Sequence, residues 1–497
     1  EGEGDALAAV YLTGGALVDR VRFVGLVSGG IKVGRYFDPP TVGVEPLYNQ
    51  NVFAPDVIAG GTLKVTDNLL FVDVAAAARQ QSIDESERYS GASLANNDRQ
   101  ADNYSVSISP YLRRTSPSES AIELRYRYIG VAINDKDSIE GVDNYLNDST
   151  AHEVVAEYDS GRLLDRVGFV TRAYANKTEE TGSDILPEVN FEQLSLSGTL
   201  RYRMNRKVSL LATVGEDDID TKGTSPFNDD DLSGTFWKAG VELLPGRKSE
   251  ARFEFGERYG GSWLDAYALY RYSSRLHFRL AGNTRLQTSA QAQVGRYGVL
   301  QSETLGFAEE LRQLGNLTSS EILDRVLEYN SGLSDIGVQQ AGLARSSDLF
   351  ADIIAQSPRT SLVLRGGLDS SDYGYQDIDS WTLNAIAEHK LSRRLSGRLQ
   401  ANYRQSLVDL TDDPDVCFAG LKLDPSYFRL SDAEIADICA DPAAFDEDAE
   451  TLSFIAGVDY LLFRNINGFL ELSRSQRFSD KAENEYLENA VTAGLEY

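Results

Sequence analysis

The sequence has no long apolar run. Its longest, Leu69 to Ala78, is interrupted by Asp73, whereas a membrane-spanning helix needs about 20 predominantly apolar residues. A helical membrane protein is therefore excluded. Only a helix or a closed barrel satisfies every backbone polar group in lipid, so if this chain spans a membrane it does so as a β-barrel.

Basic residues are few compared with acidic ones. The 48 Lys and Arg face 76 Asp and Glu, which gives a net charge of -28. A general nucleic-acid binder needs a basic surface that displaces counterions, so we expect no nucleic-acid partner. Acidic runs such as residues 216–220 and 229–231 offer oxygen ligands for calcium but lack the spacing of an EF-hand. We predict no metal site.

Histidine and cysteine are also scarce. His152, His277 and His389 fall in different predicted hairpins and have no metal-ligand spacing. The sequence shows no nucleophile with a positioned base and no phosphate-binding glycine loop, so we expect neither an enzyme nor a cofactor. Cys417 and Cys439 share one polar segment. A single disulfide between them is favoured over a zinc site, because two Cys without a nearby His fall short of four ligands.

What the sequence has in abundance is alternation with a period of two. Four runs of about a dozen residues follow one another between Leu232 and Thr288, separated by only two or three residues. In one run, Phe253 and Phe255 share one face while Arg252 and Glu254 share the other. Successive side chains of a strand point to opposite faces, so this pattern predicts long antiparallel strands with one apolar and one charged surface.

The connections between the runs alternate in length. Short turns such as Asn205-Arg206 and Ser392-Arg393 are followed by long, polar, Asp-rich loops, as in outer-membrane barrels with short periplasmic turns and long extracellular loops. We predict one all-β domain over residues 41–497, a transmembrane antiparallel up-and-down β-barrel of about 18 to 20 strands. Residues 1–40, where Gly and Pro pairs interrupt the alternation, are predicted to be an N-terminal periplasmic or luminal segment.

Two of the long loops contain helix signals. Capping boxes at residues 318–321 and 431–434 precede short apolar periodic stretches. We therefore predict helical inserts at about residues 300–345 and 408–449. Whether these helices fold over the mouth, enter the lumen or merely cap the loops in solvent is left open by the sequence.

The C-terminus points to a cellular compartment. Val491, Leu495 and Tyr497 share the apolar face of the last run, and a terminal aromatic residue on such a strand resembles the recognition signal of bacterial outer-membrane barrels. It implies contact with the barrel assembly machinery, outer-membrane lipid and lipopolysaccharide. The single Met is not at position 1 and no leader is evident. We expect a mature outer-membrane protein whose signal peptide has been removed.

The polar face of the strands is expected to line the lumen. Its charged residues either pair with one another and stiffen the wall, or line a hydrated passage for a polar solute. The predicted lumen-lining residues are Arg125, Arg127, Arg201, Arg203, Lys238, Glu242, Arg252, Glu254, Arg258, Asp265, Arg271, Arg279, Arg285, Arg398 and Arg404.

Three stretches carry a family resemblance. TVGVEPLYNQNVFAP at residues 41–55, GERYGGSWLDAYALYRYSSR at residues 256–275 and SSEILDRVLEYN at residues 319–330 resemble putative outer-membrane barrels found with exopolysaccharide and exosortase (PEP-CTERM) systems. The resemblance covers about residue 41 to the end. It implies a barrel that exports a polysaccharide beside a periplasmic polysaccharide export protein, and it supplies no site residues.

Three functions follow as hypotheses. The first is an outer-membrane channel for exopolysaccharide export, which a barrel wider than the channel-forming 16 to 18 strands can accommodate. The second is a porin-like diffusion channel for small polar solutes. The third is a structural or interaction barrel whose acidic loops bind a surface partner.

Overall fold

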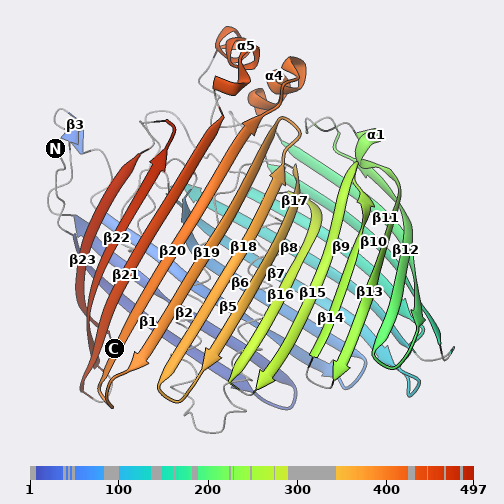
Figure 1. The fold of residues 1–497 in the computed structure, drawn as a ribbon, viewed down its shortest axis with the longest axis horizontal. Coiled ribbons are helices and arrows are strands. Elements are labelled where there is room, and N and C mark those ends of the chain that lie inside the picture. Colours follow the sequence, from blue (N-terminus) through green and yellow to red (C-terminus); the bar gives the residue numbers. More distant parts are fainter. Residues whose placement is uncertain are drawn as a thin grey trace.

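The computed structural model describes most of the chain. The described residues are 7–36, 41–42, 45–46, 51–82, 100–135, 148–161, 164, 166–181, 188–222, 225, 227, 229–246, 249–273, 275–288, 291, 343–423, 431–444, 446–463, 466–481 and 485–496. They form a barrel-shaped antiparallel sheet of 21 strands and a separate two-stranded sheet, β3 (Thr41–Val42) with β4 (Glu45–Pro46) (Figure 1).

The strands of the main sheet are long, at 10 to 17 residues each. They are β1 Leu7–Asp19, β2 Phe23–Tyr36, β5 Asn51–Thr66, β6 Leu70–Ser82, β7 Gln100–Thr115, β8 Ala121–Asp135, β9 Asp148–Asp159, β10 Val167–Thr181, β11 Val189–Arg203, β12 Val208–Asp220, β13 Gly234–Gly246, β14 Ser249–Arg258, β15 Gly261–Ser273, β16 Leu276–Thr288, β17 Leu343–Gln356, β18 Thr360–Asp372, β19 Gln376–Lys390, β20 Leu395–Leu410, β21 Glu447–Phe463, β22 Ile466–Ser479 and β23 Tyr486–Glu496.

Each strand pairs antiparallel with the next one along the chain, and β2 pairs with β5. The predicted all-β up-and-down barrel is therefore confirmed, with 21 strands in place of 18 to 20. Because 21 is odd, β1 and β23 run in the same direction. Cα atoms of these two strands approach within 8 Å, so the two ends of the sheet lie side by side.

The larger strand number comes from residues 1–40, which were expected to precede the barrel. Instead, β1 and β2 pair along their whole length, and β2 continues the sheet to β5. The alternation is hidden because Gly occupies facing positions, Gly14 opposite Gly29. Gly29 has a φ of 139°, and an added Cβ there would lie 1.9 Å from the carbonyl oxygen of Asp56. A residue without a side chain is required for this close approach.

The two rims of the barrel differ as the sequence predicted. One rim carries connections of two to seven residues, such as residues 20–22, 67–69 and 204–207, and is called the short-turn rim. The opposite rim, called the long-loop rim, receives the longer connections, together with two short ones at Tyr259–Gly260 and Tyr373–Tyr375. Tyr259 and Gly260 have φ values of 57° and 70°, as a two-residue hairpin turn with positive φ at both positions requires.

The helices belong to the long-loop rim. They are α1 (Asp229–Leu232), α4 (Pro414–Leu423), α5 (Asp432–Ala440) and the short 3₁₀ helix η2 (Pro442–Ala444). The last three occupy the predicted insert at 408–449, whereas most of the insert predicted at 300–345 lies outside the described residues. No helix in the described ranges is long and apolar enough to cross a membrane.

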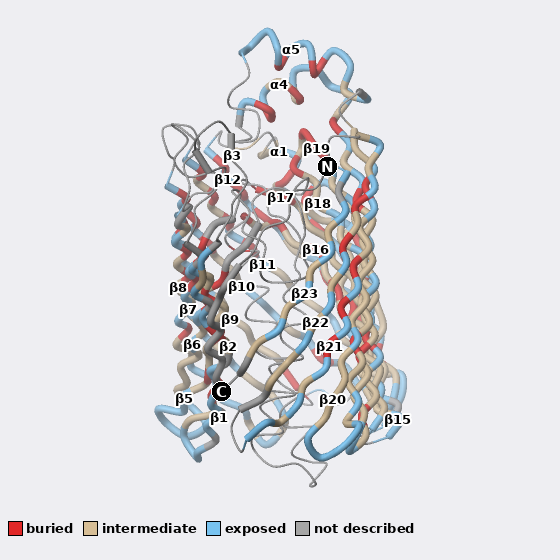
Figure 2. Tube along the Cα trace, turned by 90° about the vertical axis from the view of Figure 1, so that its left-hand side faces the viewer, coloured by how far each residue is buried: buried red, intermediate tan, exposed pale blue. Residues whose placement is uncertain are grey.

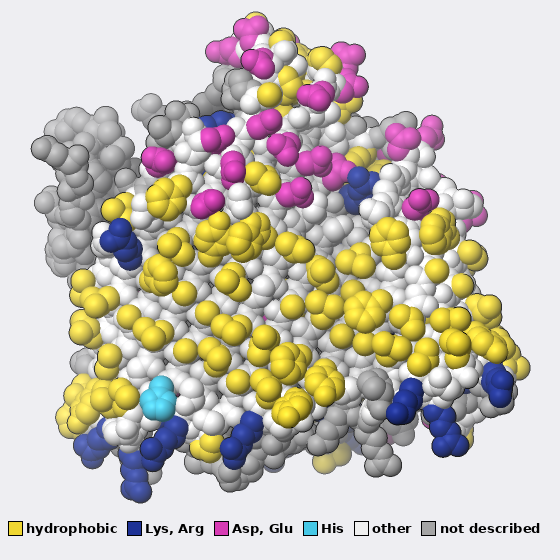
Figure 3. Space-filling model, in the orientation of Figure 1, with side chains coloured by type: hydrophobic (Ala, Val, Ile, Leu, Met, Phe, Trp, Pro, Cys, Tyr) yellow, Lys and Arg dark blue, Asp and Glu magenta, His cyan; other side chains and the backbone are white. Residues whose placement is uncertain are grey.

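The two faces of the sheet differ in polarity. Leu196, Val214 and Phe255 are exposed on the outer face, whereas Thr213 and Glu254 on the inner face are buried. On the face shown in Figure 3, apolar side chains form a belt across the outer surface, with acidic residues mostly above it and basic residues mostly below. Figure 2 shows how exposure alternates along the wall strands.

Candidate functional site

The candidate site is the charged inner face of the wall, and one of its fully buried groups is the carboxylate of Asp352. The sheet register places Asp352 on β17 between Arg279 on β16 and Arg365 on β18. Arg365 Nε donates to Oδ1 at 2.6 Å, and Arg279 Nε donates to Oδ2 at 2.8 Å. Both guanidinium groups also lie over the ring of Phe350, at 4.8 and 5.4 Å from its centroid. One carboxylate thus bridges two guanidinium groups and ties β16, β17 and β18 together in this Asp352 cluster.

A second cluster forms around Arg258, near the long-loop rim. The guanidinium donates to both carboxylate oxygens of Asp217, at 2.6 and 2.7 Å, and to Ser195 Oγ at 3.0 Å. Its Cζ lies 4.3 Å from the centroid of the Phe236 ring and 4.4 Å from that of Trp263. A bidentate ion pair with rings on the same cation fixes the guanidinium in one orientation.

The Tyr259 turn completes this Arg258 cluster. Gln193 Nε2 donates to the Tyr259 hydroxyl at 2.9 Å, and Arg345 Nη1 donates to the Tyr259 carbonyl oxygen at 3.0 Å. Burial raises the pKa of Tyr259 to about 12, so the phenol is neutral at physiological pH. These contacts hold a non-glycine residue at positive φ, a conformation that persists only where surrounding contacts impose it.

A third cluster surrounds Glu254, whose side chain is fully buried. Lys238 Nζ lies 3.4 Å from Glu254 Oε2 and 3.1 Å from Asp265 Oδ2. Arg252 donates to Glu254 at 2.5 Å, and Thr213 donates to the other oxygen at 3.4 Å. Four neighbouring strands, β12 to β15, are thereby tied together along one row of the inner face.

A fourth cluster lies near the short-turn rim. Arg125 Nη1 donates to Asp73 Oδ2 at 2.8 Å, and its Nε donates to Glu123 at 2.9 Å. Thr62 donates to the other Asp73 oxygen at 2.7 Å, and the guanidinium stacks 3.8 Å from the centroid of Tyr111. The inner wall therefore repeats one motif, an ion pair laid against an aromatic ring.

The fifteen predicted lumen residues are mostly members of such pairs. Twelve form ion pairs with described residues; Arg203 donates to the Gly161 carbonyl at 2.6 Å, and Arg271 and Arg404 also have interactions. The pairing fits the expectation that these charges stiffen the wall; a role in a substrate path stays a prediction. The twelve are Arg125, Arg127, Arg201, Lys238, Glu242, Arg252, Glu254, Arg258, Asp265, Arg279, Arg285 and Arg398.

Sequence reasoning missed most of the acidic partners. Asp73, Asp217 and Asp352 are central to their clusters, and Glu153 and Glu471 pair with Arg127 and Arg398. A signal was present in the sequence. Asp73 is a carboxylate inside an otherwise apolar run. On a strand it shares a face with the residues two positions before and after it, so the run carries a charge on that face.

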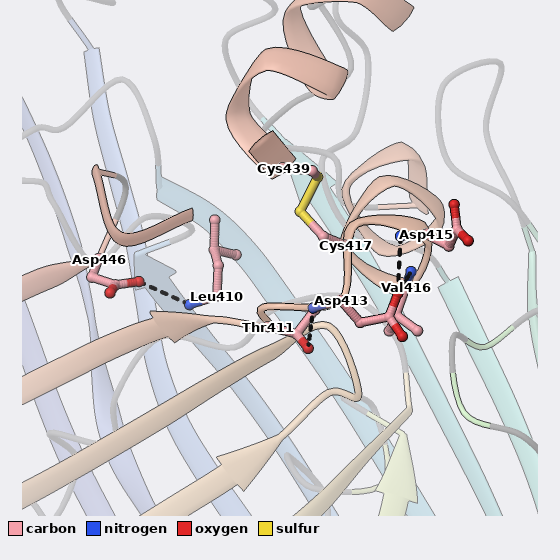
Figure 4. The surroundings of a disulfide bond; sticks show 8 residues. All are labelled: Leu410, Thr411, Asp413, Asp415, Val416, Cys417, Cys439 and Asp446. Carbon is pink, nitrogen blue, oxygen red and sulfur yellow. Dashed lines mark hydrogen bonds between the residues drawn. A yellow bond between two sulfur atoms is a disulfide. The ribbon is translucent and has the colours of Figure 1, made fainter. Parts of the chain in front are cut away.

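Cys417 and Cys439 are joined by a disulfide, with their Cα atoms 5.7 Å apart. The bond connects α4 to α5 above the long-loop rim (Figure 4). Asp413 caps α4 by accepting hydrogen bonds from the N–H groups of Asp415 and Val416, at 3.0 and 3.3 Å. Pro414 occupies the first position of α4, where proline is favourable because its missing N–H would have no partner within the helix.

The helical hairpin is attached to the barrel through an apolar core. Leu421, Ile435 and Ile438 pack with Tyr373 and Tyr375 of the β18–β19 turn. The capping box predicted at the start of α5 is present: Ser431 Oγ accepts from the Glu434 N–H, and Glu434 accepts from the Ser431 N–H at 2.7 Å. In both ribbon views the hairpin stands above the mouth of the barrel (Figures 1 and 2).

The remaining sequence-based site predictions are only partly covered. Val491 is exposed on β23, and Leu495 belongs to the same strand, but Tyr497 lies outside the described residues. In the described part of the chain, no group of three or more His, Cys, Asp or Glu residues could hold a metal ion. His152 Nδ1 lies 2.7 Å from the Tyr126 hydroxyl, and His389 Nδ1 lies 2.9 Å from Thr360 Oγ1.

Comparisons with known proteins assign no family. No family model matches the chain, and no curated protein matches it.

Solved structures resemble the chain only in outline. The ferric-catecholate import receptor Fiu from E. coli K12 is 9% identical, with a TM-score of 0.44 over 99% of this chain and 80% of that chain. The siderophore receptor PirA from Pseudomonas aeruginosa is 10% identical, with a TM-score of 0.39 over 99% and 77%. The FrpB iron transporter from Neisseria meningitidis is 7% identical, with a TM-score of 0.37 over 99% and 81%. At these values the likenesses carry no argument about the activity of this chain.

Proposed function

We propose that this chain is a bacterial outer-membrane channel that exports an exopolysaccharide, together with a periplasmic export partner. The observation that carries the proposal is the contrast between the two faces of one 21-stranded wall. The outer face bears an apolar belt (Figure 3), whereas the inner face bears ion pairs and polar side chains. That arrangement suits a barrel whose outside contacts lipid and whose inside contacts water.

The chemistry of the inner face suits a neutral or weakly charged polymer. Twelve of the fifteen predicted lumen residues are held in ion pairs with described residues, so a passing solute meets hydrogen-bonding groups whose charges are largely balanced. Rings such as Trp263 and Tyr111 are stacked against guanidinium groups of these pairs and add apolar area to the inner face. Barrels of 16 to 18 strands already leave an aqueous channel, so the size of the wall permits a glycan chain.

The cellular test is deletion of the gene, with surface glycan as the readout. Secreted glycan is expected to disappear and to return on complementation with the full chain. An unchanged glycan surface in the deletion strain, with the purified barrel still conducting in planar bilayers, would instead identify a diffusion channel for small polar solutes. Absence of conductance, with acidic loops that capture a partner, would identify an interaction barrel.

A matched pair of tryptophan variants tests the path itself. Trp263 shares the inner face with Asp265, whereas Trp381 is exposed on the outer face beside Leu383. In planar bilayers, glycan oligomers are expected to block the current of the native barrel. Trp263→Ala should weaken this block and Trp381→Ala should not. An equal effect of both substitutions would contradict a path along the inner wall.

A further inference from the structure

The two rims of the barrel carry opposite charge, although the chain as a whole is acidic. The long-loop rim exposes carboxylates, whereas exposed Lys and Arg gather at the short-turn rim, immediately below the apolar belt (Figure 3). We call the ten exposed cations at or next to the described short turns the basic rim. They are Arg20, Arg22, Arg114, Arg166, Arg206, Lys207, Arg275, Arg359, Arg393 and Arg394.

Little opposes this charge locally. In the described parts of the same turns, the exposed acidic residues are Asp67 and Glu119. A chain with 28 more negative than positive charges has therefore concentrated cations at one level of the barrel. Such a separation makes the short-turn rim an anion-binding surface despite the acidic total.

Large apolar residues stand beside the cations. Val21, between Arg20 and Arg22, is 88% exposed, and Tyr272, three residues before Arg275, is 71% exposed. Met204 and Leu391 are likewise exposed next to basic residues of their turns. An apolar side chain beside a long cationic one suits the boundary between acyl chains and headgroups, where the apolar group enters the hydrocarbon and the cation reaches a phosphate.

The basic rim extends along the sheet. Its members occur from the β1–β2 turn to the β19–β20 turn, which is nearly the whole circumference. A single protein partner would need only one sector of this ring. A surrounding layer of lipid headgroups contacts every sector, so the distribution favours lipid.

We propose that the basic rim binds the phosphate groups of anionic phospholipids in the leaflet that surrounds the short turns. The proposal rests on the membrane-spanning barrel proposed above and goes beyond transport. Each bound lipid would place its phosphate against one or two cations and its acyl chains against the neighbouring apolar belt. The barrel would consequently carry a layer enriched in acidic lipid on this side.

Electron spin resonance with spin-labelled lipids measures this selectivity directly. The full-length barrel is reconstituted in phosphatidylcholine with a trace of labelled phosphatidylglycerol or labelled phosphatidylcholine. We expect phosphatidylglycerol to be preferred about fivefold, as one cation near an anionic surface would give, and high salt to reduce the preference. Equal association of the two labelled lipids with the native barrel would overturn the proposal.

Two variants separate charge from folding. Replacing Arg20, Arg22, Arg206, Arg393 and Arg394 by Gln removes half of the basic rim and should lower the preference from about fivefold to about threefold, whereas Lys at the same five positions should preserve it. A matched control replaces five exposed carboxylates of the opposite rim by Asn, and it should leave the preference unchanged. The control positions are Asp218, Asp220, Asp377, Asp379 and Asp409.

Bilayer conductance keeps this test distinct from that of the proposed function. A Gln variant that conducts normally but has reduced lipid selectivity supports the basic rim as a separate lipid site. A Gln variant with the full selectivity of the native barrel refutes the role of these cations. Binding of an acidic glycan to the rim without lipid selectivity also overturns the proposal, since it assigns the surface to another partner.

Discussion

Removal of the Asp352 carboxylate should be the most damaging single change to the wall. The side chain is 0% exposed and is the shared partner of Arg279 and Arg365. Asp352→Asn keeps the shape of the side chain but removes the buried negative charge that Arg279 and Arg365 share. Removing one partner of a buried ion pair costs about 3 to 5 kcal/mol, and we expect a loss of that size in the free energy of unfolding.

The same strand supplies a matched control. Asp348 lies four residues away on the same face and pairs with Arg285 at 3.3 Å, but it is 30% exposed and Arg285 is 35% exposed. A solvated pair of this kind contributes about 0 to 1 kcal/mol. Asp348→Asn removes the same charge from the same strand, so the difference between the two variants measures the combined effect of burial and of the shared pairing with two Arg residues.

Denaturant unfolding of the barrel in lipid vesicles measures both variants. Asp352→Asn should lower the transition midpoint clearly and Asp348→Asn only slightly. A double variant, Arg279→Gln with Asp352→Asn, should recover part of the loss because only one of the two guanidinium groups then faces the lost carboxylate. Equal costs for the two single variants, or a cost below about 1 kcal/mol at Asp352, would refute the view that buried ion pairs hold the wall.

Three further predictions concern the helical hairpin above the mouth. Reducing the Cys417–Cys439 disulfide, which closes a loop with a sequence separation of 22, should destabilise the hairpin by about 3 kcal/mol and raise its proteolytic cleavage rate about 100-fold; an unchanged rate would contradict this. The capping hydrogen bonds lower the pKa of Glu434 below its usual 4.5. Their contribution to the stability of α5 is therefore fully present above pH 4.5 and is lost as pH falls through the lowered pKa. In Glu434→Gln, the protease resistance of the hairpin should no longer depend on pH in this window. Gly420→Ala would place a Cβ 2.1 Å from Tyr375 Cγ and should detach α4 from the rim, which faster cleavage of an otherwise intact barrel would reveal.

The regular part of the wall follows from the sequence because each strand carries its own evidence. Side chains two residues apart share a face, so the alternation around Phe253 and Glu254 predicts both the strand and its orientation. The alternation of short and long connections also predicts that the two rims of the barrel differ. The capping box at Ser431 is similarly local, since its partners are three residues apart.

Features that join distant segments could not be predicted in this way. Arg279 and Asp352 are 73 residues apart, and Arg125 and Asp73 are 52 apart. Their pairing depends on the register between strands, which no single strand encodes. β1 and β2 were missed for another reason: Gly residues lack the side chains from which a period of two is recognised.

The order of the strands also bears on how the wall is made. Every ladder in the described sheet joins a strand to its sequence neighbour, apart from the short step from β2 to β5, so the wall can grow one hairpin at a time from local contacts. The approach of β1 to β23 is different because it brings together opposite ends of the chain. Closing a loop of several hundred residues costs about 5 kcal/mol in chain entropy, and contacts of such long range form slowly. Folding should therefore end at this seam, where two strands that run in the same direction meet last.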